Sequence, residues 1–161
     1  MKNSYVNILI ESLKDKDLVL DEVIAEDKKQ AEILKSEDPD LQELEKSQER
    51  IGELAVKLDK LNEGFQSVYD RVRGELQNNK EQYKDEIKIL QELITIITGK
   101  SVKVEAEQNR NKKNAQKLFK EKKKSFAAQR STVRKLNLYA NQMHNVIPAG
   151  QAEAAFLDKK K

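Results

Sequence analysis

The chain has 161 residues, the length of one domain, and contains equal fractions of charged and apolar residues, 37% each. With five Gly, two Pro and 5% aromatic residues, this composition favours long helices packed as a bundle. The absence of Cys excludes a disulfide framework and a thiolate zinc site. No signal peptide is recognisable, and no apolar run approaches the ~20 residues of a membrane span. We therefore expect an all-α cytoplasmic protein.

The net charge of +3 conceals a difference between the two parts of the chain. Residues 99–161 carry 16 Lys and Arg against 5 Asp and Glu, whereas residues 1–98 carry 15 against 23. An asymmetry of this kind indicates either pairing between the two parts or an external partner.

The first predicted helix covers residues 4–35. Apolar residues recur along it with coiled-coil spacing from Val6 to Leu34, and Asp17 and Asp27 interrupt this seam. The break at residues 36–40 predicts a helix end, with Asp38 as the N-cap of a second helix that begins at Pro39. Because the connection is short, the second helix should run antiparallel to the first.

The second predicted helix covers residues 39–77 and has the most regular pattern in the chain. Its main apolar series recurs every seven residues: Leu44, Ile51, Leu58, Phe65 and Val72. Gly52, Gly64 and Gly74 lie off this seam, where each costs about 1 kcal/mol relative to Ala.

A turn at residues 78–79 separates this helix from a third, predicted over residues 80–145, in which Gly99 is a site for a cap or a kink. Residues 146–161 are expected to form a flexible tail. The predicted fold is an elongated antiparallel hairpin or three-helix bundle, with coiled-coil-like packing, a long C-terminal helix and a single domain over residues 1–145.

Helix lengths predict an overhang. At 1.5 Å per residue the third helix draws level with the start of the second near residue 118, so residues 119–145 should extend about 40 Å beyond the stack. An uncovered apolar stripe there must either fold back or await a partner. We predict partner-binding residues on this stripe: Phe119, Phe126, Val133, Leu136, Tyr139 and Met143. Three neighbouring cations are expected to give electrostatic support: Lys122, Arg130 and Arg134.

The basic run itself suggests an alternative partner. Residues 110–135 hold 11 Lys and Arg against Glu121 alone, and such a stretch could neutralise nucleic-acid phosphates. The spacing of its Phe residues is typical of a packing stripe, which makes a nucleic acid the weaker alternative. His144 is the only histidine and is expected on the surface. We predict no enzymatic activity, no cofactor and no metal site.

Several stretches resemble the FlgN family of flagellar type III export chaperones. They are Ala31–Leu34, the break that follows, Leu41–Ile51 and Leu54–Leu61, while Asn137–Met143 and Phe156–Lys161 resemble the clostridial branch. The resemblance implies a chaperone that holds the helical termini of hook–filament junction proteins, prevents premature assembly and delivers them to the export gate.

The resemblance also implies a cargo site in the C-terminal helical region and a contact between Tyr139 and the export-gate protein FlhA. Ala140 follows this Tyr where the family often has Gly. The alternatives are a structural or adaptor coiled coil, another helical secretion chaperone, and the nucleic-acid-binding protein considered above.

Overall fold

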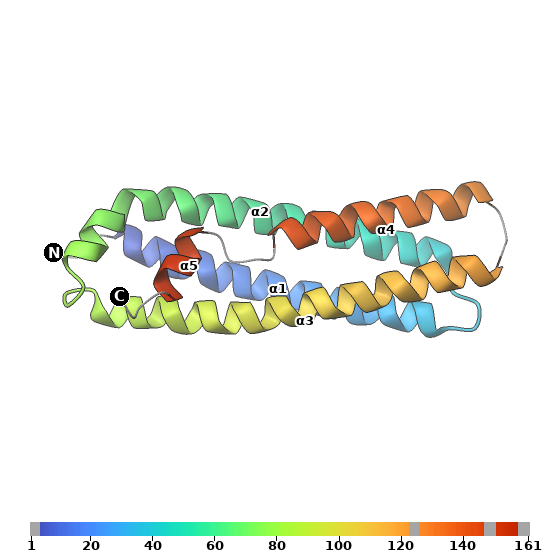
Figure 1. Ribbon diagram of the computed structural model, residues 1–161, viewed down its shortest axis with the longest axis horizontal. Helices are drawn as coiled ribbons and strands as arrows, with labels where there is room; N and C mark the ends of the chain where they lie inside the picture. Colours follow the sequence, from blue (N-terminus) through green and yellow to red (C-terminus); the bar gives the residue numbers. More distant parts are fainter. Residues whose placement is uncertain (1–3, 123–125, 147–150, 158–161) are drawn as a thin grey trace.

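The computed structural model describes residues 4–122, 126–146 and 151–157, and it is a bundle of antiparallel helices (Figure 1). Its five helices are α1 (Tyr5–Lys35), α2 (Leu41–Asn78), α3 (Lys84–Lys122), α4 (Phe126–Val146) and α5 (Gln151–Leu157). The described residues contain no strand, so the predicted all-α bundle is confirmed. None of the described helices combines the length and hydropathy that a membrane crossing requires.

The first two helices form as the apolar spacing predicts, with one change at the start of α2. Its N-cap is Asp40, whose Oδ1 accepts hydrogen bonds from the backbone N–H groups of Gln42 (2.9 Å) and Glu43 (3.3 Å). The prediction of Asp38 as the cap is therefore wrong. Asp40 is the residue whose carboxylate reaches the free N–H groups of the first turn.

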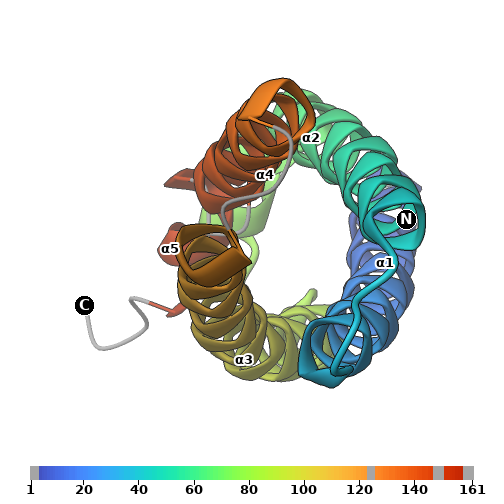
Figure 2. The same cartoon turned by 90° about the vertical axis from the view of Figure 1, so that its right-hand side faces the viewer.

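The helices α1, α2 and α3 share an apolar core, because α1 packs against both of the others. Viewed along the bundle, α1, α2, α4 and α3 follow one another around a ring (Figure 2). Five leucines with 1% or less of their surface exposed represent this core: Leu9, Leu13, Leu54, Leu58 and Leu90.

The expected single helix over residues 80–145 is wrong. The segment forms two helices, α3 and α4, and the second packs back against α3 and α2 (Figure 1). Gly99 does not cap a helix, because α3 continues through it. The predicted overhang is absent, since folding back buries Leu136 and Met143 of α4 instead of leaving them in water.

The expectation of a flexible tail is also wrong for residues 151–157. These residues form α5, which packs against α2 and α3 and buries Ala152, Glu153 and Phe156. Residues 147–150 and 158–161 of the expected tail lie outside the described residues.

Candidate functional site

Both C-terminal helices pack against α2 and α3 (Figure 2). We call the surface that α2 and α3 present to α4 and α5 the α2/α3 groove. The helix α4 has 21 residues and covers ~30 Å of the groove, whereas the α2 wall has 38 residues and is ~57 Å long. The short helix α5 crosses another part of the groove, nearer the end of α2 and the start of α3 (Figure 1). Two separate helices therefore cover one long surface.

The side chains predicted to bind a partner do not form one open stripe. Leu136 and Met143 of α4 are buried, with 5% and 0% of their surface exposed. Tyr139 is partly buried between them and packs against the core. Phe119 is partly buried on α3. In this conformation the protein itself covers Leu136 and Met143, so a partner could reach these two side chains only after α4 moved.

The remaining predicted positions are described less fully. Phe126, Val133 and Arg130 belong to α4 and Lys122 belongs to α3, but their side chains lie outside the described residues. Arg134 is exposed on α4.

Beneath α4 lies a layer of buried polar side chains contributed by three helices: Asp27 and Gln30 of α1, Gln48 of α2, and Gln108 and Asn111 of α3. Asn111 Nδ2 donates to the backbone carbonyl of Asp27 (3.0 Å) and to Gln30 Oε1 (3.3 Å). Gln48 is 1% exposed, yet neither its Nε2 nor its Oε1 has a hydrogen-bond partner among the described residues. Gln30 Nε2 also lacks one. Each unpaired buried group costs roughly 1–3 kcal/mol.

The polar layer meets α4 directly. Gln30, Gln48 and Gln108 border a cavity of about 10 Å³ that Leu136, Tyr139 and Ala140 of α4 close from the other side. The cavity has about the room that one water molecule requires. The apolar side of α4 is thus packed on amide groups to which it contributes no hydrogen bond.

Asp27 is the one carboxylic acid among the five residues of this layer, and its pKa is strongly raised. It is fully buried, and this burial raises its pKa from 3.8 to about 8, although a hydrogen bond from Gln108 Nε2 to Oδ1 (3.2 Å) opposes the rise. The nearby Glu107 raises the pKa further. Asp27 is therefore largely protonated at neutral pH in the folded chain.

Polar contacts fix the position of α4 along the groove. Lys135 pairs with Glu45 of α2, which raises the pKa of Lys135, and His144 Nδ1 lies 3.0 Å from Glu105 Oε1 of α3. Asn62 Nδ2 of α2 donates to the carbonyl of the last residue of α4 (2.8 Å). His144 is exposed, as predicted. The Lys135–Glu45 pair joins the basic C-terminal part to the acidic N-terminal part, and the His144–Glu105 contact joins α4 to α3 within the C-terminal part.

The helix α5 is held by side chains that come from the core of the bundle. Lys16 of α1 and Glu153 of α5 form an ion pair at 2.8 Å, and both side chains are at most 3% exposed. The ring of Phe156 makes edge-to-face contacts with Phe65 (6.2 Å between centroids) and Tyr69 (5.2 Å) of α2. Burial also raises the pKa of the Tyr69 phenol.

Two glutamines of the groove bind the backbone of α5. Gln66 Oε1 of α2 accepts a hydrogen bond from the backbone N–H of Ala152 (3.3 Å). Gln91 Nε2 of α3 donates to the backbone carbonyl of Phe156 (3.0 Å). We call the residues that hold α5 the α5 seat: Lys16, Phe65, Gln66, Tyr69 and Gln91.

Sequence reasoning did not identify the α5 seat. One signal was available, because Lys16 lies between Leu13 and Leu20 at helical spacing and so interrupts the apolar side of α1. Asp17, which interrupts the apolar seam in the sequence analysis, does not belong to the α5 seat. It pairs with Lys100 of α3 at 2.6 Å. The hydrogen bonds that Lys100 donates to Asp17 and Asp21 raise the pKa of Lys100.

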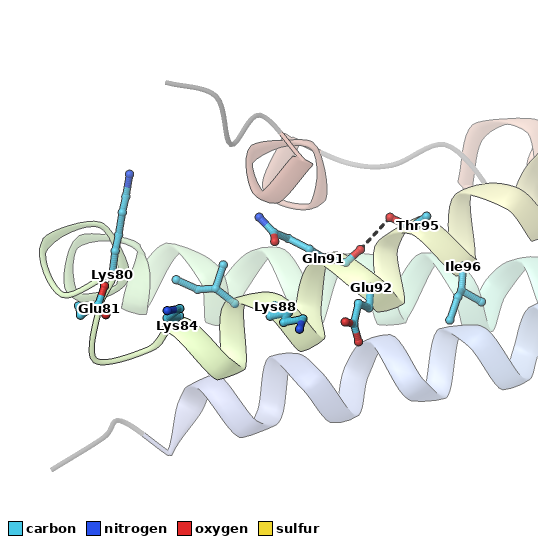
Figure 3. Close-up of a pocket in the computed structure, with 9 residues that line it drawn as sticks. Lys80, Glu81, Lys84, Lys88, Gln91, Glu92, Thr95 and Ile96 are labelled. Atoms are coloured by element: carbon cyan, nitrogen blue, oxygen red, sulfur yellow. Dashed lines mark hydrogen bonds between the residues drawn. The ribbon is translucent and has the colours of Figure 1, made fainter.

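An open hollow of about 930 Å³ adjoins the α5 seat along the start of α3 (Figure 3). Its walls include Lys80, Lys84, Lys88 and Glu92, together with Gln91, whose side chain extends toward α5. Gln91 belongs to both sites, so the hollow continues the α5 seat toward the end of the bundle.

The arrangement offers buried apolar, amide and charged contacts for a helix. Among the described residues, no cluster of three or more His, Asp or Glu could hold a metal ion. The comparisons add no relative: no family model matches the chain, and neither a curated protein nor a solved structure matches it significantly.

Proposed function

We propose that this protein is a FlgN-like export chaperone of the cytoplasm. It would bind the helical termini of hook–filament junction proteins, prevent their premature assembly and deliver them to the export gate. The observation that carries the proposal is the cover of the α2/α3 groove by α4, which leaves Gln48 buried with both amide atoms unpaired. The resemblance of the sequence to FlgN proteins supplies the class of cargo.

The mechanism we propose is exchange of one helix for another. A cargo helix with a polar residue facing Gln48 and Gln30 would satisfy amides that α4 leaves unpaired, and an apolar stripe on the same helix would replace Leu136 and Met143. The exchange exposes α4, so the cargo must bring more favourable contacts than α4 makes. The unpaired amides weaken the binding of α4 and so reduce the contact energy that the cargo must supply.

Charge would guide the exchange. When α4 leaves, Glu45 of α2 and Glu105 of α3 lose their partners Lys135 and His144 and become available to basic residues of a cargo helix. Complementary charges of this kind fix the register of a helix and speed its encounter with the groove.

Tyr139 would connect cargo binding to delivery. Its ring lies against Gly52 of α2 in the closed bundle, and the resemblance gives this residue a contact with FlhA. Release of α4 would free the ring for that contact. In this mechanism only the cargo-loaded protein presents Tyr139 to the gate.

The test is capture of the hook–filament junction proteins of the same organism by the full-length chain. Gln48→Met removes the unpaired amide at similar volume, so it should stabilise the fold by roughly 1–2 kcal/mol and weaken cargo capture at least fivefold. Gln77→Met, on the exposed side of α2, is the matched control and should leave capture unchanged.

Failure of the natural chain to capture any junction protein would refute the proposed function. Capture that is equally strong with Gln48→Met would refute helix exchange at α4 and leave the chaperone assignment in place.

A further inference from the structure

The α5 seat recognises four separate features of one helical turn. Lys16 pairs with a carboxylate, and two aromatic rings enclose the ring three residues later in the sequence of α5. Gln66 accepts from a backbone N–H at the start of the turn, and Gln91 donates to a carbonyl at its end. Residues three apart lie on the same side of a helix, so Glu153 and Phe156 enter the seat together.

The buried ion pair makes this recognition selective without making it strong. Removing Lys16 and Glu153 from water costs about as much as their attraction returns, so the pair adds little net stability. An uncharged or basic residue in place of the Glu would leave Lys16 buried without a counter-charge, which is strongly unfavourable. The ion pair therefore contributes more to the selectivity of the seat for a segment with an acidic residue than to its affinity for that segment.

The helix α5 is also easy to displace. It has seven residues, and a helix of this length is not stable alone in water. Its helical form depends on the contacts of the seat. When α5 leaves, Lys16 and Glu153 both return to water, so release strands no charge.

We propose that the α5 seat is a docking site for a helical segment of another protein that carries an acidic residue three positions before an aromatic one. The segment would replace α5, which occupies the seat in the free chain. The α5 seat is separate from the α4 contact described above, and the inference takes from the proposed function only the class of partner, a helical segment of another protein.

The experiment uses full-length protein and a fluorescein-labelled synthetic peptide with the sequence of residues 147–161. In the Glu153→Gln/Phe156→Ala variant the seat loses its internal competitor, which is present at a millimolar effective concentration in the natural chain. Fluorescence anisotropy should give at least tenfold tighter peptide binding to this release variant than to the natural chain. Equal binding to both would overturn the proposal.

Exchanging the charges of Lys16 and of the peptide's Glu153 tests whether the peptide binds at the α5 seat. Adding Lys16→Glu to the release variant should weaken the natural peptide at least tenfold, and a peptide carrying Glu153→Lys should recover most of the loss. Gln91→Ala in the release variant tests the seat through a surface residue and should weaken binding at least threefold. Absence of compensation, or no effect of Gln91→Ala, would overturn the assignment to this seat.

Two further peptides define the partner. An alanine-rich helical peptide that retains only Glu and Phe three apart should bind within tenfold of the natural peptide, and one with the two residues two apart should not bind.

If the natural chain instead forms a dimer in light scattering that Phe156→Ala dissociates, the occupant is a second copy and the proposal of a different protein is wrong. Failure to capture junction proteins would leave all these peptide measurements unaffected.

Discussion

Tyr139 of α4 lies so close to Gly52 of α2 that a Cβ on this glycine would stand 2.7 Å from Tyr139 Cε1. Gly52 is buried in the middle of a helix, where glycine is ordinarily unfavourable by about 1 kcal/mol. The close approach of the ring explains the residue. A glycine that seemed to lie off the packing seam of α2 is the point at which the fourth helix docks.

Gly52→Ala should therefore behave differently from Gly64→Ala. Position 64 has open space around it on the same helix, so alanine there should stabilise the chain by about 0.5–1 kcal/mol through helix propensity. At position 52 the ring of Tyr139 must move, and we expect a net loss of stability in urea unfolding. In a Tyr139→Ala background Gly52→Ala should become as favourable as Gly64→Ala, and persistence of the difference would contradict the contact.

The pKa of Asp27 predicts a specific pH dependence. Between pH 4 and about 8 the unfolded chain releases this proton while the folded chain retains it, so this group's contribution to stability falls as pH rises and levels off above 8. Asp27→Asn removes the titration, and its stability advantage over the natural chain should grow by roughly 3 kcal/mol between pH 5 and pH 8. Asp59→Asn, at an exposed position of α2, is the control. Parallel stability curves for Asp27→Asn and the natural chain would mean that Asp27 is ionised in the fold.

Lys16→Met should release α5 without unfolding the bundle. The substitution leaves Glu153 without a counter-charge, so undocking α5 into water becomes the favourable alternative. Amide hydrogen exchange of residues 151–157 should rise at least tenfold while α1 and α2 keep their protection. The double variant Lys16→Met/Glu153→Met should restore much of that protection, because both charges are then gone. Lys100→Met, which breaks the partly exposed pair with Asp17, should leave α5 protected.

The N-cap of α2 can be tested at one residue. Asp40→Ala removes the acceptor for the N–H groups of Gln42 and Glu43 and should cost about 1 kcal/mol of stability, measured by urea unfolding. Asp40→Asn keeps an oxygen at the same place and should cost far less. Equal losses for the two variants would show that charge, and not the cap hydrogen bonds, is what matters at this position.

The sequence by itself determined the fold class and the first two helices. Apolar spacing along α1 and α2 is long and regular, and the break before Leu41 is marked by a proline and a capping acid. The helix α3 ends at Lys122, close to residue 118, where the helix was expected to draw level with the start of α2 and then continue beyond it. For α1 and α2 the apolar spacing and the capping residues are sufficient, because they favour the same helices as the tertiary contacts do.

Only the tertiary structure decided what happens after Lys122. The sequence between α3 and α4 contains neither Gly nor Pro, and helical periodicity continues on both sides, so no local signal distinguishes a long helix from two antiparallel ones. Burial of Leu136 and Met143 in the α2/α3 groove favours the fold with two helices. The same reason applies to α5, whose seven residues are too few to form a helix alone and whose place depends on Lys16, more than a hundred residues earlier in the chain.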